Sequence, residues 1–155
     1  MPIIELDMLI AFVNKVDELH NIAVGIFNKI INGKLSNVVV PTSAYMEYEL
    51  VLKSRGYSED TISSDINAFR RIKNLGEIPL TSKVIIKASE LRKRYGITYF
   101  DSLHAASAFF HDKMIISTDK VYRKIPELKA IDPREVSNSK NHMNNRLKTN
   151  RTIKN

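Results

Sequence analysis

The sequence has no cysteine among its 155 residues. This absence excludes disulfide bonds, zinc–thiolate sites and thiol nucleophiles together. No apolar run approaches the roughly 20 residues that a membrane-spanning helix needs. The N-terminal MPIIELDM also lacks the basic flank and cleavage site of a signal peptide. We therefore expect a soluble, cytoplasmic protein that does not contact a membrane.

Acidic residues are lacking at the C-terminus, within a chain whose net charge is +7. Residues 137–155 contain no acid and five basic residues, which are Lys140, Arg146, Lys148, Arg151 and Lys154. Because this asparagine-rich stretch has few apolar residues to bury, it is predicted to be a disordered basic tail. Such a tail is suited to non-specific contact with phosphates, or it is only a solvated terminus, and composition does not decide between the two.

The remaining residues, 1–136, have the size and apolar content of one compact domain. Short runs rich in branched residues are typical of strands and occur at residues 3–6, 38–40, 78–80, 114–117 and 129–131. Apolar residues at helical spacing, with capping and stop residues, predict helices at residues 8–14, 21–32, 43–54, 58–76, 82–96, 101–111 and 120–125. Strands that alternate with helices predict a three-layer α/β/α sandwich with a central parallel sheet.

Four acids lie where such a sheet would bind a ligand, beyond the carboxyl ends of its strands. Asp7 follows the first predicted strand, and Asp119 follows the strand at residues 114–117. Glu47 lies in the helix after the second strand, and Asp101 begins the helix that leads into the strand at 114–117. The sequence therefore predicts that carboxylates from distant segments converge at one edge of the sheet.

Carboxylates that share a pocket raise each other's pKa and destabilise the fold unless a cation neutralises them. Mg²⁺ and Mn²⁺ take oxygen ligands and can activate water for attack on a phosphodiester. The four acids are thus candidate catalytic residues and metal ligands, and the site needs no histidine or cysteine.

A purely structural role competes with this interpretation. Asp7, Asp101 and Asp119 each stand where an aspartate could cap the N-terminus of a helix. Glu47 is harder to explain in that way, because it falls on the stripe of its helix that faces the core. Glu49 is a rival acid two residues further on, but it lies on the other side of the helix and is interpreted as solvated.

Four motifs occur in order between residues 3 and about 132. They are IIELDMLIAFVNKVDELHNIA, VVVPTSAYMEYELVL, FDSLHAASAF and IISTDKVY. Each places an acid beside an apolar strand or at the start of a helix. In this order and spacing they resemble the PIN domain, the nuclease fold of VapC-type toxins.

The resemblance implies a metal-dependent ribonuclease in which Asp7, Glu47, Asp101 and Asp119 surround one or two Mg²⁺ or Mn²⁺ ions. It implies that Ser117, at a position where threonine is commoner, donates a hydrogen bond to a carboxylate or a water at the site. It also implies an RNA substrate, the role of toxin in a type II toxin-antitoxin pair, an antitoxin protein as partner, and a homodimer.

Other functions stay open at this point. One is a non-catalytic PIN-fold module that binds RNA or protein, and another is an RNA-processing nuclease outside toxin-antitoxin systems. A receiver or phosphatase is a third, although no lysine ends a late strand as such proteins need. His104, one turn after Asp101, is interpreted as a packed or partly exposed helix residue rather than as a catalytic base.

Overall fold

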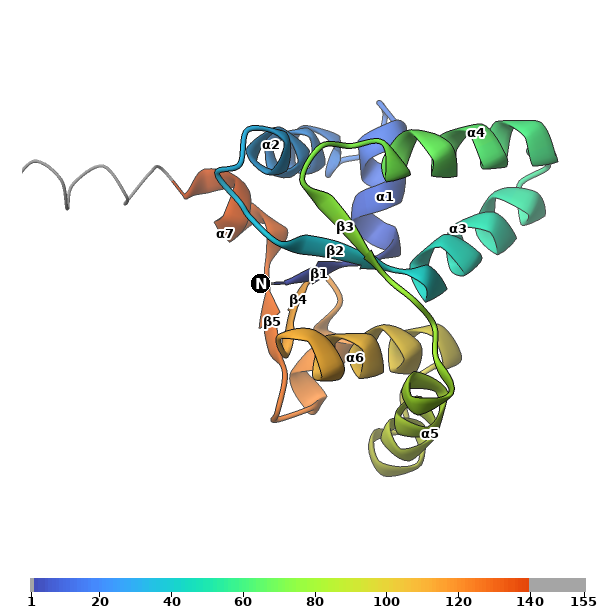
Figure 1. The fold of residues 1–155 in the computed structure, drawn as a ribbon, viewed down its shortest axis with the longest axis vertical. Helices are drawn as coiled ribbons and strands as arrows, with labels where there is room; N and C mark the ends of the chain where they lie inside the picture. The colour runs from blue at the N-terminus through green and yellow to red at the C-terminus, as the bar shows by residue number, and fades with distance from the viewer. Residues whose placement is uncertain (1, 140–155) are drawn as a thin grey trace, which may run out of the picture.

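A computed structural model describes residues 2–139 of the chain. At its centre is one sheet of five parallel strands in the order β3-β2-β1-β4-β5 (Figure 1). The strands are β1 (Ile3–Ile4), β2 (Val38–Pro41), β3 (Leu75–Ile78), β4 (Met114–Ile116) and β5 (Lys129–Ile131). The short strand β1 has the central place and pairs with β2 on one side and β4 on the other. The predicted parallel sheet is confirmed.

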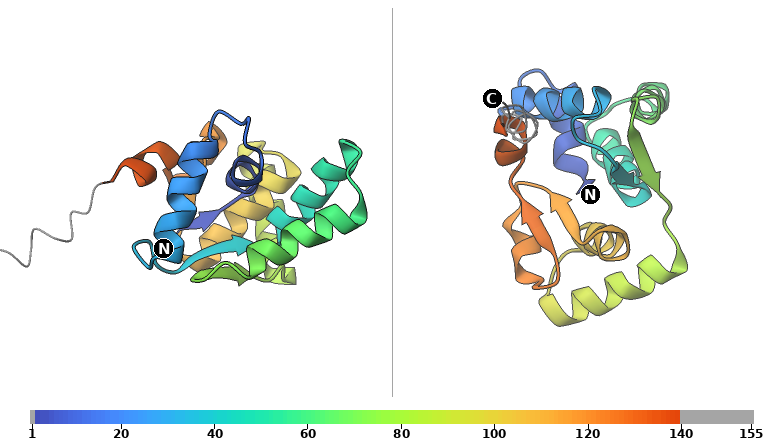
Figure 2. Two further views of the ribbon diagram at one scale, coloured as in Figure 1. Left: turned by 90° about the horizontal axis from the view of Figure 1, so that it is seen from above. Right: turned by 60° about the vertical axis from the view of Figure 1, so that its left-hand side comes forward.

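Helices cover both faces of the sheet, as the views in Figure 1 and Figure 2 show. One face carries α1 (Leu6–Val13), α2 (His20–Ile31), α3 (Thr42–Ser54) and α4 (Glu59–Arg70), with α7 (Pro133–Asn138) beside α2. The other face carries α5 (Ser82–Tyr95), α6 (Tyr99–His111) and the 3-10 helix η1 (Lys120–Lys124). The predicted α/β/α sandwich is therefore confirmed. Within residues 2–139, no helix combines the length and the apolar character needed to cross a membrane.

Alternation along the strands divides the buried residues between two cores. Ile4 and Ile116 pack into the core beneath α1 to α4, whereas Ile3 and Ile115 pack into the core beneath α5 and α6. Successive side chains of a strand point to opposite faces, so each pair of neighbours serves both cores. Because both faces of the sheet are apolar and covered, its polar side chains gather at the strand ends.

The segment before β3 differs from the prediction. The helix predicted at residues 58–76 ends at Arg70, and the strand predicted at 78–80 lies at Leu75–Ile78. Gly76 is a strand residue paired with Val39, and a Cβ atom at Gly76 would lie only 2.8 Å from Cγ1 of Val39. This glycine therefore allows two strands to approach closely and does not end a helix.

Helix α7 was not covered by any prediction. Asp132 caps its N-terminus by accepting a backbone hydrogen bond, and Pro133 occupies its first turn. Lys29 of α2 donates hydrogen bonds to the backbone carbonyl groups of Val136 and Ser139, at 2.5 and 2.9 Å. The helix thus extends past residue 136, the predicted end of the domain. The part of the predicted tail from 140 to 155 lies outside the described residues.

Candidate metal-binding active site

The site begins at the carboxyl ends of the two central strands. Glu5 directly follows β1 and Ser117 directly follows β4, and the register that pairs Ile4 with Ile116 brings the two residues to the same edge. The Ser117 hydroxyl donates a 2.6 Å hydrogen bond to Oε1 of Glu5 and lies 3.4 Å from Oδ2 of Asp7. One hydroxyl group therefore joins two carboxyl groups, as expected for a residue that orients the acids of a site.

Asp7 lies in the first turn of α1 and is not its N-cap residue, a position that Glu5 occupies. The backbone N–H and the hydroxyl of Thr118 both donate to its Oδ2, at 2.9 and 3.0 Å. Its other oxygen, Oδ1, is buried and has no hydrogen-bond partner. Burial raises the pKa of Asp7, and the hydrogen bonds from Thr118 act in the opposite direction. The capping interpretation of Asp7 is therefore wrong.

Glu5 is the site residue that the sequence did not reveal. It is only 6% exposed, and its pKa is raised well above the usual range, first by burial and then by the charge of Asp7. In the sequence Glu5 stands inside the apolar run 3–6, which predicts a strand and gives no sign of a site residue. The signal that could have found it is its position one residue after β1, at the edge where ligands bind.

Glu47 reaches the same site from the second turn of α3. Its Oε2 lies 3.6 Å from Nε2 of His104. Burial, followed by the charge of Asp101, raises the pKa of Glu47 to about 7. Glu49 does not join this group, because its side chain is 44% exposed and lies 3.8 Å from Nζ of Lys53. Glu49, the alternative to Glu47 as the acid of this helix, thus lies on the solvated side of α3.

Asp101 is the third residue of α6, and Thr98 is the N-cap. The backbone N–H of Asp101 donates to the Thr98 hydroxyl, which in turn donates to the Asp101 carboxylate. The N-cap of α6 is thus Thr98, and the predicted capping role of Asp101 is wrong. The phenol of Tyr122 donates to the second carboxylate oxygen, Oδ1, at 3.5 Å. Asp101 therefore supports the helix start and also faces the site through Tyr122.

Asp119 is the N-cap of η1, where its Oδ1 accepts the backbone N–H of Val121 at 2.8 Å. The capping interpretation is correct for this acid. Its own backbone N–H donates to the Ser117 hydroxyl at 3.0 Å. Asp119 is accordingly tied to the Glu5 and Asp7 pair through Ser117.

Tyr122 connects the acids on the inner side of the site. The ring is fully buried, and burial together with the charges of the surrounding acids raises its pKa well above the usual range. The acids that act on it are Glu5, Asp101, Asp7 and Asp119. The structure thus places Asp101 in contact with this phenol and Glu47 beside His104, while Asp7 and Asp119 both lie beside Ser117.

His104 is fully buried between two of the acids. Its Nδ1 lies 3.7 Å from Oε2 of Glu5 and 3.4 Å from the Tyr122 hydroxyl. Burial lowers its pKa to about 4, against a smaller opposing effect of the Ser43 backbone. The ring is therefore neutral at neutral pH, and its contacts with the carboxylates are not ion pairs. The prediction of a packed helix residue is correct, but the packing lies inside the candidate site.

The donor set suits a hard divalent cation. The acids supply only oxygen atoms, and the buried Oδ1 of Asp7 has no partner. Burial raises the pKa of Glu5, Asp7 and Glu47, and the charges of Asp7 and Glu47 raise that of Glu5 further. Cations such as Mg²⁺ and Mn²⁺ bind through one or more carboxylates and remove the repulsion between them. The residues present therefore fit the predicted metal.

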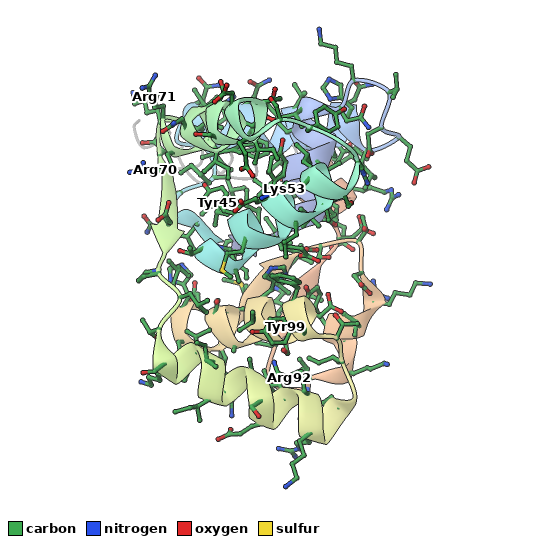
Figure 3. The ribbon with its side chains drawn as sticks, turned by 90° about the vertical axis from the view of Figure 1, so that its right-hand side faces the viewer. Tyr45, Lys53, Arg70, Arg71, Arg92 and Tyr99 are labelled. Atoms are coloured by element: carbon green, nitrogen blue, oxygen red, sulfur yellow. The ribbon has the colours of Figure 1, made fainter. Side chains whose placement is uncertain are left out.

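A cation and an aromatic ring, Arg92 and Tyr99, lie side by side where α6 begins (Figure 3). Tyr99, 55% exposed, stands two residues before Asp101, and the guanidinium carbon of Arg92 lies 4.9 Å from the centre of its ring. Nη1 of Arg92 also donates to the Ser102 hydroxyl at 2.7 Å, which fixes the guanidinium over the ring. A surface depression of about 650 Å³ lies elsewhere, at the amino ends of the strands, and is lined by residues such as Asn37 and Asn74.

The fold and the acid cluster define an α/β/α protein whose polar edge is suited to metal-assisted hydrolysis. A family model described as the PIN domain matches residues 7–128. The chain therefore belongs to the PIN domain family, whose members are nucleases. The match begins at Asp7, so it does not include Glu5.

Two solved structures share the fold. VapBC2 from Rickettsia felis, bound to a promoter DNA fragment, is similar with a TM-score of 0.64 and 16% identity, over 83% of this chain and 96% of that one. A toxin-antitoxin complex from Klebsiella pneumoniae is similar with a TM-score of 0.59 and 15% identity, over 86% of this chain and 98% of that one. At these identities the likeness concerns the fold alone. No curated protein sequence matches the chain.

Proposed function

We propose that the chain is a metal-dependent endoribonuclease and acts as the toxin of a type II toxin-antitoxin pair. The proposal rests above all on one observation, the convergence of acids from β1, α1, α3, α6 and the end of β4 at one edge of the sheet. Its catalytic, metal-binding acids are the predicted Asp7, Glu47, Asp101 and Asp119, joined by Glu5.

The chain's own groups prepare these acids for a cation. The Ser117 hydroxyl holds Glu5 and receives the backbone N–H of Asp119. Thr118 holds one oxygen of Asp7 and leaves the other without a partner. A bound Mg²⁺ or Mn²⁺ ion would offset the acidic charge and supply Lewis-acid assistance to the attack of water on a phosphodiester. Arg92 and Tyr99, beside Asp101, offer a nucleic-acid strand a cation and a ring face for stacking.

Purified full-length protein, incubated with structured RNA and Mn²⁺ or Mg²⁺, tests the nuclease. We expect EDTA to stop the cleavage and Asp7→Asn to abolish it. Glu49→Gln is the matched control, because Glu49 is a solvated acid near Lys53, and it should leave cleavage unchanged. Equal cleavage by the wild type and Asp7→Asn would contradict the proposal. Absence of cleavage with either ion would instead favour a non-catalytic module that binds RNA or protein.

The toxin role is supported by the two structural neighbours, which come from a VapBC assembly and a toxin-antitoxin complex. An antitoxin protein is accordingly proposed as a partner, and a homodimer as the assembly of the chain. Induced expression should arrest growth of a bacterial host, and Asp7→Asn should not. Growth that continues under the active wild-type nuclease would favour an RNA-processing role instead.

A further inference from the structure

His104 carries a nitrogen atom that the fold leaves without a partner. Its side chain is 0% exposed, and Nε2 finds no hydrogen bond among the described residues. Nε2 is not directed at an apolar wall, since Oε2 of Glu47 lies 3.6 Å away. A buried polar atom without a partner destabilises the fold, so the position calls for a ligand that would use it.

The contacts of the other ring nitrogen, Nδ1, bear on which of the two nitrogens carries the hydrogen. The Tyr122 hydroxyl donates its hydrogen to Oδ1 of Asp101, so its oxygen is free to accept. Nδ1 of His104 lies 3.4 Å from that oxygen and 3.7 Å from a carboxylate oxygen of Glu5. A ring that binds a cation through Nε2 carries its hydrogen on Nδ1, where both of these oxygens can accept it. The Ser43 backbone and Glu47 are the competing partners of the ring, and a histidine whose second nitrogen is held by such oxygens is typical of metal ligands.

We propose that Nε2 of His104 binds the divalent ion of the site together with one carboxylate oxygen each from Glu5 and Glu47. One ring nitrogen and one oxygen from each acid lie within 4.8 Å of one another. Ligands about 2.1 Å from an ion lie at most about 4.2 Å apart, so small side-chain movements bring the three to a common ion. The inference rests on the proposed metal-dependent function and specifies the chemistry of its metal.

A nitrogen ligand changes which metal the site prefers. Purely oxygen sites suit Mg²⁺, whereas imidazole favours transition metals, and affinity among these rises from Mn²⁺ through Co²⁺ to a maximum at Cu²⁺. The site should therefore bind Mn²⁺ and Co²⁺ more tightly than Mg²⁺. His104 is what sets this preference, because the acids alone would not create it.

Pulsed electron paramagnetic resonance of Mn²⁺ bound to the full chain tests the ligand directly. We expect the wild type to show coupling to a directly bound ¹⁴N nucleus, and His104→Gln to lose it. We also expect His104→Gln to weaken Mn²⁺ binding by about 10-fold to 100-fold or more. Losing a residue that only hydrogen-bonds a metal ligand already costs this much. His20→Gln is the control, since Nδ1 of His20 is hydrogen-bonded to the Ala11 carbonyl at 2.8 Å.

The outcomes separate the two proposals. Tight Mn²⁺ binding without nitrogen coupling in the wild type would overturn the role of His104 and leave the metal-dependent nuclease standing. Failure of the wild type to bind any divalent ion would overturn both. The wild-type spectrum decides even if His104→Gln does not fold, so the test does not depend on the variant.

Discussion

The acids of the site form two groups that differ in how the fold treats them. The inner acids, Glu5, Asp7 and Glu47, are crowded and have raised pKa values. The outer acids, Asp101 and Asp119, each take part in the start of a helix through Thr98 or Val121. The outer acids have a structural use without a cation, whereas the inner acids are raised in pKa by burial, and Glu5 also by the charges of Asp7 and Glu47. The inner group is therefore the stronger sign of function.

The largest expected difference between the groups is in cleavage of RNA. Glu5→Gln removes a negative charge from the centre of the inner group and should lower cleavage on the order of 100-fold or more. Asp119→Asn should cost only about 10-fold, since the Asp119 carboxylate is exposed and the backbone hydrogen bond to Ser117 remains in the variant. Initial rates with saturating Mn²⁺ measure both. A larger loss in Asp119→Asn than in Glu5→Gln would reverse the ranking of the two groups.

The next expected effect is on the pH dependence of stability in the absence of metal. Burial, followed by the charge of Asp101, raises the pKa of Glu47 from its ordinary 4.5 to about 7 in the folded state, so the protonated form of Glu47 favours folding. This contribution is fully present below pH 4.5 and is lost as the pH rises through 7. Glu47→Gln should therefore gain in melting temperature over the wild type between pH 5 and pH 8, by about 2–4 °C for each kcal/mol recovered.

His104 acts in the opposite sense in part of this range. Its pKa is lowered to about 4, so its contribution grows as the pH rises from 4 to 6.5. The difference between Glu47→Gln and the wild type, both in EDTA, isolates Glu47. A difference that does not change between pH 5 and pH 8 would show that Glu47 titrates as a solvated acid.

A smaller effect is expected from the cap that holds the outer acid Asp101. Thr98→Ala removes the N-cap hydroxyl of α6 and should cost about 1 kcal/mol of unfolding free energy. Thr81→Ala, which removes the equivalent cap of α5, should cost a similar amount. Only Thr98→Ala should also weaken Mn²⁺ binding, because it frees the Asp101 side chain. Urea unfolding and metal titration of both variants would reveal whether the cap positions the acid.

The smallest effect is expected outside both groups. Glu49→Gln should leave cleavage unchanged and alter the free energy of unfolding by less than about 0.5 kcal/mol, because the Glu49 to Lys53 contact is solvated. Urea unfolding and initial rates measure the two quantities. A marked loss of activity in this variant would place the site on the outer side of α3 instead.

The sequence predicted the layers of the fold because strand and helix periods differ clearly in most segments. It failed between Arg70 and Leu80, where Gly76 was predicted to end a helix and its pairing with Val39 shows instead that it belongs to a strand. Helix α7 was missed because it has only six residues. Its hydrogen bond from Lys29 joins residues more than a hundred positions apart, which a local pattern cannot reveal.

The site was predicted in part for a related reason. Acids that follow a strand or begin a helix can be recognised from the sequence alone, which is why Asp7 and Asp119 were predicted as site residues. Glu5 looks like a strand residue until the pairing of β1 with β4 sets it against Ser117. His104 looks like helix packing until α6 is placed against the acids of β1 and α3. The places of Glu5 and His104 in the site depend on contacts between segments far apart in the sequence, and a local sequence pattern does not reveal such contacts.

The most direct test of the inner group as a cation site is thermal unfolding of the full chain across a Mn²⁺ titration at pH 8. A ligand that binds only the folded state stabilises it by about 2.7 kcal/mol at 100 times its Kd. We predict that the melting temperature of the wild type rises steadily with Mn²⁺ and that Asp7→Asn, folded and equally stable or more stable in EDTA, shows almost no rise. Equal rises in the two proteins, or none in the wild type, would contradict the assignment.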